Sequence, residues 1–498
     1  MFGQVHDLAI IGGGLTGCAI ARDAAGRGLS VFLCEEGDLA SGGSSATSKL
    51  VQGGLHHLQN LDLVALREAL VESAILARAA PHLVRPVRFL LPHHERQWSA
   101  TAIGLGLFAY DHLARRGLPR SRRLALETEP DRDQLQPHFR TVFAFQDYVA
   151  DDSRLAVANA IDARAHTAEV NPRLRCTVAE REGDRWRLSL ESVEDGARFT
   201  VLARALVNAA GSRVGEVLDH VIHTSQRTIT SLVKSACIAV RRFTEPAFAL
   251  PTADGGIVYA VPFARDLTLI GPVESRHPVG PAPMGVARRE AAYLLDVANQ
   301  YFDPPIAPGD VVASFACARA RPAHGAGAGR RSDMIVDDPP RLAPVISVFG
   351  GSLTTHRRLA ERVVDRLGRF MAVGRRWTAA AALPGGSFPG EGTIDLMRAL
   401  RAAYPFVAEA HAARLVAAYG TRASAMLTGF RNASDLGRRF GGDLTEAEVR
   451  FLIAEEWART AEDVLWRRSK LGFRFSPAET RALADWMSEA TATATVAR

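Results

Sequence analysis

The stretch DLAIIGGGLTGCAIARDAAGRGLSVFLCEE, residues 7–36, decides the fold. Its pattern predicts an apolar strand, a glycine turn, a helix of small residues and a second apolar strand. The turn carries the spacing G-x-G-x-x-G at Gly12, Gly14 and Gly17, and Glu35 follows the second strand. Such an order is typical of a dinucleotide-binding βαβ unit in a doubly wound α/β sheet.

Each residue of this motif has a physical role in dinucleotide binding. Gly12 permits a tight turn out of the strand, Gly14 lets a pyrophosphate approach the backbone, and Gly17 lets helix and strand pack closely. The helix N-terminus offers N–H groups to the phosphates, and Glu35 can accept hydrogen bonds from a ribose. The motif alone leaves FAD and NAD open, and a glycine-rich turn in another α/β domain is the alternative.

Length and composition indicate an ordinary globular protein. The chain has 498 residues, enough for two or three domains, with 47% hydrophobic and 23% charged residues. The net charge of +6 suits an anionic ligand or a membrane surface, but it is equally common in other soluble proteins. We find no nucleic-acid-binding module and no metal-ligand spacing, and therefore expect neither nucleic acid nor metal as partners.

Cysteine usage and hydropathy indicate the compartment. The five cysteines are scattered and form no C-x-x-C pair, which indicates a reducing compartment without structural disulfides. The N-terminus does not resemble a signal peptide, and no apolar run reaches about 18 residues. We expect a cytoplasmic protein that can lie on the inner face of the cell membrane, and the sequence allows a homodimer.

Several further segments have interpretable patterns. The Gly- and Ser-rich stretch 37–58 is interpreted as a second phosphate and flavin contact, with a flexible loop as the alternative. Asp62 is expected to cap the next helix, and Asp152 or Ser153 the helix after it. The pattern of residues 220–320 is mostly that of strands, which predicts an antiparallel sheet forming one wall of a pocket. The arginine run 115–123 is typical of a solvated loop, with an anionic or membrane contact as the alternative.

The remainder after the linker at 383–392 has a helical pattern. Thr445–Glu448 and Ser476–Glu479 both match a capping box. These signals predict a separate helical domain of about 110 residues.

Taken together, several stretches resemble the FAD-dependent glycerol-3-phosphate dehydrogenases of respiration over nearly the whole chain. They are the opening motif, SSATSKLVQGGLHHL, GLFAYDHLARR, VADDSRLAVANA, LVNAAG, SVFGGSLTTHRRLAE and EEWARTAEDVLWRRSKLG. The resemblance implies a glutathione-reductase-like FAD-binding Rossmann domain, a β-sheet substrate domain and a helical C-terminal domain. Their expected ranges are 1–90, 147–215 and 340–380 for FAD, 91–146 and 216–339 for substrate, and 385–498 for the helical domain.

The resemblance also implies an activity. Members of this family oxidise sn-glycerol 3-phosphate to dihydroxyacetone phosphate by hydride transfer to flavin N5, and the electrons pass to a membrane quinone. The positions that match the family's FAD motifs are intact, which favours FAD over NAD. They are Gly12, Gly14, Gly17, Glu35, Ser44, Ser45, Ser48, Lys49, Gly211, Gly350, Gly351, Leu353 and Thr354.

The substrate-side motifs depart from the family. QGGLHH stands where the family usually has HGGLRY, GGSLTTHR replaces GGKLTTYR, KSAC replaces KGSH, GPVE replaces GTTD, and CARA replaces GVRP. Lys234 and Arg319 are retained, whereas Cys237 occupies a His position and Ser352 a Lys position. A phosphate needs several cationic or bidentate donors, and Arg319 is the one that is clearly kept. Losing two charged contacts, at about 1.5–3 kcal/mol each, would weaken phosphate binding by roughly two to four orders of magnitude.

We assign Arg319 to the substrate phosphate and His56 to the base that takes the substrate hydroxyl proton. His57 is the other imidazole close in sequence to Ser44, Ser45, Ser48 and Lys49, and packing against the pocket is the alternative role for both. Arg321, His324 and Arg357 are candidates to replace the missing cations. Three functions remain open: a glycerol-3-phosphate dehydrogenase with altered preference, an FAD enzyme of an unphosphorylated hydroxy or amino substrate, and a non-catalytic flavin-binding paralogue.

Overall fold

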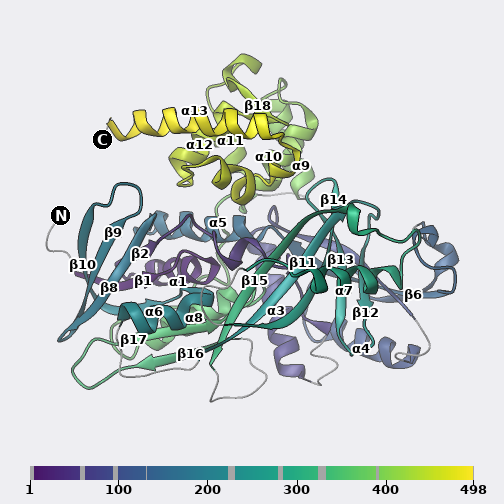
Figure 1. Cartoon of the computed structure of the whole chain (residues 1–498), viewed down its shortest axis with the longest axis horizontal. Helices are drawn as coiled ribbons and strands as arrows, with labels where there is room; N and C mark the ends of the chain where they lie inside the picture. Colours follow the sequence, from purple (N-terminus) through teal and green to yellow (C-terminus); the bar gives the residue numbers. More distant parts are fainter. Residues whose placement is uncertain are drawn as a thin grey trace.

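The described residues form two large β-sheets with covering helices and a helical C-terminal lobe that contains a small two-stranded sheet (Figure 1). The computed structural model describes residues 5–55, 62–93, 99–130, 132–222, 230–278, 284–322, 332–388 and 392–496. His56, His57 and the glycine-rich stretch 324–331 lie outside the described residues.

The first sheet contains the predicted dinucleotide unit. Its parallel part has the order β7 (Glu169–Pro172), β2 (Val31–Glu35), β1 (Val5–Ile11), β10 (Arg198–Asn208), β17 (Val345–Gly350). β16 (Ser332–Asp337) adds an antiparallel edge, and the hairpin β8 (Leu174–Glu182) and β9 (Arg185–Ser192) pairs with β10.

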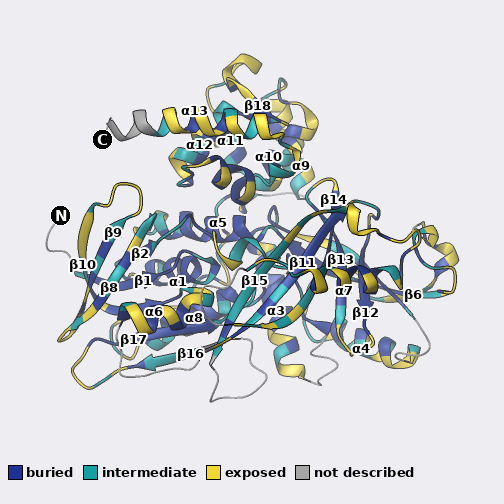
Figure 2. Ribbon diagram, viewed as in Figure 1, coloured by how far each residue is buried: buried dark blue, intermediate teal, exposed yellow. Residues whose placement is uncertain are grey.

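Both faces of this sheet are covered. Leu8 and Ile10 of β1 face a core shared with the helices α1 (Leu15–Gly26), α5 (Asp152–Ala165) and α8 (His356–Leu367). Ala9 and Ile11 point to the other face, where β9 and the short helix α6 (Val214–Val217) pack. Strands covered on both faces are mainly apolar, as residues 8–11 of β1 and most of β17 are, and both strands are largely buried (Figure 2).

The second sheet is mainly antiparallel, as the pattern over 220–320 predicts. Its order is β15 (Val311–Pro322), β11 (Thr230–Arg241), β14 (Leu267–His277), β13 (Ile257–Phe263), β12 (Ala247–Pro251), β4 (Val84–Pro92), β6 (Thr141–Ala150), β3 (Leu50–Val51), with β5 (Arg122–Ala125) beside β6. α7 (Arg288–Asn299) packs on one face, and α3 (Leu63–Ala79) and α4 (Ala100–His112) pack on the other. The predicted domain boundaries stay a prediction.

The C-terminal lobe has a hydrophobic core made of its own residues and lies above α5 in Figure 1. Its helices are α9 (Thr393–Ala403), α10 (Glu409–Tyr419), α11 (Arg422–Met426), α12 (Glu446–Glu455) and α13 (Pro477–Val496), and its short strands are β18 (Arg439–Gly441) and β19 (Leu444–Thr445). A π-helical turn, η8 (Asp463–Arg468), contacts α5.

Two of the predicted helix caps are confirmed. The Asp62 side chain accepts a hydrogen bond from Ala65 N at 3.0 Å at the start of α3. Ser476 and Glu479 bond each other's backbone N–H groups, at 3.2 and 2.8 Å, before α13. Both bonds satisfy N–H groups that a helix start leaves free.

Two other predicted caps are wrong. Thr445 makes no side-chain cap bond, because Glu448 is buried in the lobe core, where Arg414 binds both its oxygens at 2.7 Å. Asp151 caps α5, accepting from Arg154 N at 3.2 Å, in place of Asp152 or Ser153. The Asp152 side chain instead accepts a hydrogen bond from Lys49.

Candidate cofactor and substrate site

A cavity of about 2770 Å³ lies where the carboxyl ends of the parallel strands meet the second sheet. The ends of β1, β2, β10 and β17 form one side, and residues of β11, β13, β14 and β15 form the other. Ligands of open parallel sheets bind at this edge, because the strand order changes direction there.

The glycine turn after β1 forms the floor of the cavity. Gly12 has a φ of +113°, and a Cβ at this position would lie 2.6 Å from Ala209 O of the neighbouring strand. A Cβ on Gly17 would overlap the carbonyl oxygen of Gly12. Gly14 is the N-cap of α1 and lines the cavity, so the helix N-terminus is open to an anionic group.

Glu35 lies at the end of β2, on the cavity wall. Its carboxylate accepts hydrogen bonds from Gly13 N at 2.7 Å and from Gly37 N at 2.8 Å. These bonds fix the carboxylate while leaving lone pairs for hydroxyl donors such as those of a ribose.

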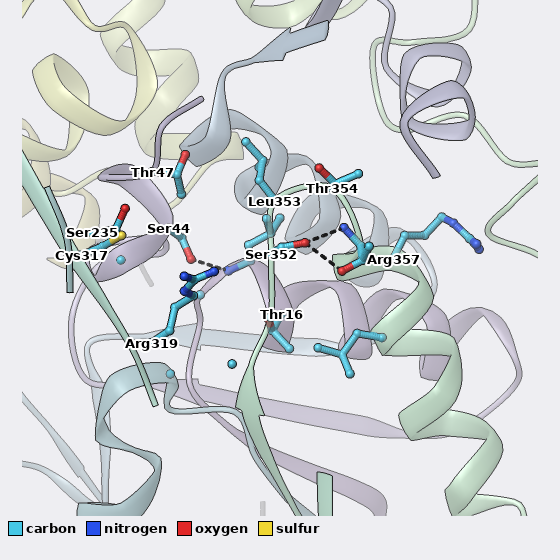
Figure 3. Close-up of a pocket in the computed structure, with 18 of the residues that line it drawn as sticks. Thr16, Ser44, Thr47, Ser235, Cys317, Arg319, Ser352, Leu353, Thr354 and Arg357 are labelled. Atoms are coloured by element: carbon cyan, nitrogen blue, oxygen red, sulfur yellow. Dashed lines mark hydrogen bonds between the residues drawn. The ribbon is translucent and has the colours of Figure 1, made fainter. Parts of the chain in front are cut away.

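The stretch 37–49, named the flavin loop from here on, crosses the cavity (Figure 3). Ser44 Oγ accepts a hydrogen bond from Leu15 N at 2.9 Å, which ties the loop to the first turn of α1. Ser48 also lines the cavity, whereas Ser45 and Lys49 do not. Lys49 is buried, and its Nζ donates to Ser45 O and Asp152, both at 2.6 Å.

The turn after β17 completes the cofactor side. Gly350 and Gly351 have φ values of +76° and +103°, a conformation that favours glycine. Thr354 Oγ1 accepts from Gln52 N at 3.2 Å and donates to Gln52 O at 3.3 Å, which joins this turn to the QGG segment. Gly211, with a φ of +62°, closes the end of β10 on the same wall.

Ten of the thirteen residues assigned to the cofactor line the cavity: Gly12, Gly14, Glu35, Ser44, Ser48, Gly211, Gly350, Gly351, Leu353 and Thr354. Gly17, Ser45 and Lys49 lie behind this wall and support it. An extended dinucleotide fits this wall, because glycines without side chains, a helix N-terminus and a fixed carboxylate follow one another along it.

The substrate side is formed by β15 and β14. Cys317 on β15 is close to the flavin loop, since a Cβ on Gly43 would lie 3.2 Å from its Cβ. Arg319 is on the same face of β15 and points toward the flavin loop (Figure 3). One guanidinium nitrogen is paired with Glu274, whereas Arg319 Nε is buried without a hydrogen-bond partner among the described residues.

Other expected cations are engaged elsewhere. Lys234 Nζ is 2.7 Å from Glu290 and donates to Gly285 O at 2.8 Å, and it does not line the cavity. Arg357 lines the cavity but binds Glu72 at 2.6 and 2.8 Å and Glu361 at 2.5 Å. Arg319 therefore remains the best-placed cation for a substrate anion among the described candidates.

Two positions carry an uncharged residue where the family has a Lys or a His, namely Ser352 and Cys237. Both residues have structural roles. Ser352 accepts a hydrogen bond from Thr355 N at 3.1 Å at the start of α8. Cys237 is buried, and this burial raises the pKa of its thiol to about 12, so it is a poor nucleophile.

Two residues that the structure places at or beside the site, Thr16 and Asp152, were not predicted to be functional from the sequence. Thr16 lines the cavity, and its position inside the G-x-G-x-x-G motif could have indicated this. Asp152 is fully buried and accepts from Thr47 Oγ1 at 2.8 Å. A carboxylate at the first position of a helix carries no such signal in the sequence.

Comparisons with known proteins identify the family of the chain. A family model described as FAD dependent oxidoreductase matches residues 7–366, and one described as the C-terminal domain of alpha-glycerophosphate oxidase matches residues 376–493. Glycerol-3-phosphate dehydrogenase of Pseudomonas aeruginosa is 40% identical, covering 97% of this chain and 95% of that protein. D-erythritol 1-phosphate dehydrogenase of Brucella abortus is 38% identical, covering 98% of both chains.

The fold is also that of a solved relative. The structure of glycerol-3-phosphate dehydrogenase from Bacillus halodurans complexed with FAD has a TM-score of 0.74 and 24% identity, covering 98% of this chain and 91% of that chain. The glycine-lined wall, the fixed Glu35 and these matches agree on one cofactor. The chain belongs to the FAD-dependent oxidoreductases of the glycerol-3-phosphate dehydrogenase family.

Proposed function

We propose that the protein oxidises the secondary hydroxyl of a small polyol phosphate, with glycerol 3-phosphate as the first candidate and dihydroxyacetone phosphate as the product. The observation that carries this proposal is Arg319, whose buried Nε lacks a partner among the described residues and whose side chain lies beside the flavin loop. A guanidinium in this position suits a phosphate, because it can donate two parallel hydrogen bonds. FAD, when bound, accepts the hydride from the substrate carbon.

Arg319 does not act as a lone cation. Glu274 already neutralises part of its charge, so an incoming phosphate must compete with a carboxylate. The same carboxylate can accept hydrogen bonds from further substrate hydroxyls. His56 stays our proposal for the base, since the QGG segment that precedes it lies on the cavity wall.

A longer polyol phosphate is the second candidate. It is supported by the 38% identity to D-erythritol 1-phosphate dehydrogenase and by the Glu274 carboxylate on the cavity wall. The departures from the family's phosphate-binding motifs also favour a changed substrate preference.

The test is anaerobic reduction of the purified FAD-loaded protein, followed by flavin absorbance. Glycerol 3-phosphate, erythritol 1-phosphate and unphosphorylated glycerol are compared as substrates. Arg319→Ala should raise KM for the phosphorylated substrates roughly 10- to 100-fold, with little change for glycerol. Arg198→Ala, which removes an exposed arginine paired with Glu191, serves as the control.

Two outcomes would contradict the proposal. Unchanged KM in Arg319→Ala would remove Arg319 from phosphate binding. Bleaching only by unphosphorylated alcohols or amines would instead indicate an enzyme of that substrate class.

We also propose that electrons leave to a quinone and that the protein binds a membrane surface. No helix within the described ranges is long and apolar enough to cross a membrane. On α4, however, Leu105 is 70% and Phe108 is 60% exposed, and the exposed Arg115, Arg120, Arg122 and Arg123 follow this helix. An exposed apolar helix face beside a basic cluster suits anionic lipid headgroups.

A second basic segment, Arg467, Arg468 and Lys470, does not serve this purpose. Arg467 and Arg468 are buried and paired with acidic groups of the protein. A membrane contact through residues 467–470 is therefore excluded by their position.

A further inference from the structure

The C-terminal lobe holds the start of the flavin loop by direct ion pairs and its end through Asp152 of α5. The loop follows β2, contains Asp38 near its start, and ends at Lys49 directly before β3. Between these points, Ser41 to Ser44, Thr47 and Ser48 line the cavity. The position of this short segment therefore sets the shape of the cofactor side.

Asp38 anchors the start of the loop and is only 3% exposed. Arg468 donates from both Nη atoms to the two carboxylate oxygens, each at 2.8 Å, and Arg467 Nε donates to Oδ2 at 2.6 Å. Both arginines belong to η8 of the C-terminal lobe. A buried carboxylate needs such pairing, because an isolated charge is costly to remove from water.

Asp152 anchors the end of the loop from the first turn of α5. It accepts from Thr47 N at 3.1 Å and from Lys49 Nζ at 2.6 Å. Lys470 of the lobe is 3.8 Å from the same carboxylate and donates to Ser153 Oγ at 2.7 Å. Burial favours a higher pKa for Asp152, but Lys49 and Lys470 outweigh it and hold the pKa below its usual value.

We infer that the C-terminal lobe is a working part of the FAD site, in which Arg468 is a positioning residue for the flavin loop. Its two-pronged contact fixes both the place and the direction of the Asp38 carboxylate, which a single ammonium cannot do. A shift of the loop would also disturb the bond between Ser44 and Leu15 N at the helix N-terminus. This inference depends on FAD and not on the identity of the substrate.

The test compares Arg468→Gln and Arg468→Lys with Arg164→Gln. Arg164 also joins α5 to the lobe, through Glu455 at 2.9 Å, but it lies at the opposite end of α5 from Asp152. FAD is titrated into each apoprotein, and the dissociation constant and the visible spectrum of the bound flavin are measured. Arg468→Gln should weaken FAD binding about tenfold or more, Arg468→Lys by less, and Arg164→Gln not measurably.

A second measurement separates positioning from simple attachment of the lobe. Unfolding of the apo and FAD-loaded forms is followed for each variant. If Arg468 only attaches the lobe, both forms lose the same stability and the FAD dissociation constant is unchanged, which would overturn the inference. The inference predicts a larger loss in the FAD-loaded form.

Arg468→Gln leaves Asp38 buried without its main partner, so this variant can fail to fold. The double variant Asp38→Asn with Arg468→Gln removes both charges and avoids that cost. It should still bind FAD more weakly than the unaltered protein, because the bidentate contact between Arg468 and Asp38 is missing. Full FAD affinity and an unchanged flavin spectrum in the double variant would overturn the inference.

Discussion

His356, which stands where the family has a tyrosine, follows the turn after β17 and makes the stability of the protein depend on pH. Its side chain is 1% exposed and its Nδ1 lies 2.8 Å from Leu353 O, so it is neutral and donates to this carbonyl. Burial, opposed by the Leu353 bond and reinforced by the charges of Arg357 and Arg22, lowers its pKa to about 4. An unfolded histidine titrates near the usual 6.5.

This difference predicts a loss of stability in acid. Between pH 6.5 and 4 the unfolded chain binds a proton at His356 that the folded chain does not. The contribution is therefore complete above pH 6.5 and falls as the pH drops, by about 3 kcal/mol in all. His356→Gln keeps a donor for Leu353 O without titrating, so its unfolding free energy, measured by urea between pH 4 and 8, should vary less. Parallel curves for the two proteins would contradict this prediction.

At the same scale, the sequence predicts some residues well and others not at all. Gly12 and Gly17 could be predicted because their function is local: the turn and the close packing need a missing side chain. Arg468 could not, because its partner Asp38 lies 430 positions away and an Arg-Arg pair usually indicates an exposed surface. Lys49 was assigned to the cofactor because its neighbours match the motif, yet its ammonium supports the loop from behind.

At the scale of elements, α4 has one buried face and one exposed face. Tyr110 is buried, bonds Asp147, and accepts from Gly53 N of the cavity wall at 2.9 Å. Leu105 and Phe108 face solvent on the same helix. The apolar run of residues 102–110 is too short to span a bilayer, and its pattern could not show which side chains the fold leaves outside.

The exposed face of α4 gives a prediction for membrane binding. Replacing both Leu105 and Phe108 by Glu should reduce sedimentation with anionic liposomes roughly tenfold or more, because apolar area is lost and charge repulsion is added. Higher salt should weaken binding of the unaltered protein through the arginines after α4. Glu at the exposed Val312 and Phe199, on other elements, is the control. Equal sedimentation of both double variants would exclude α4 as the contact.

At the scale of the whole molecule, the lobe contributes to the flavin site but has a core of its own. That core draws on residues from Leu400 to Met487, and one cluster of buried polar groups is paired within the lobe. Arg414 binds Glu448 and Asp443, and Tyr419 donates to Glu448 at 2.7 Å. The helical pattern and the linker predicted a separate unit, whereas its contacts with the flavin loop required the assembled structure.

These contacts predict different fates for the two parts when the chain is divided at the linker. Residues 392–498 should fold alone, with helical circular dichroism and a cooperative thermal transition, since their apolar core is complete. Residues 1–388 should lose most FAD binding, because Asp38 then lacks Arg467 and Arg468. Mixing the two fragments should restore flavin binding in part, in a concentration-dependent way. Full FAD affinity of residues 1–388 alone would show that the lobe is dispensable for the site, and a non-cooperative transition of residues 392–498 would show that its core depends on the rest of the chain.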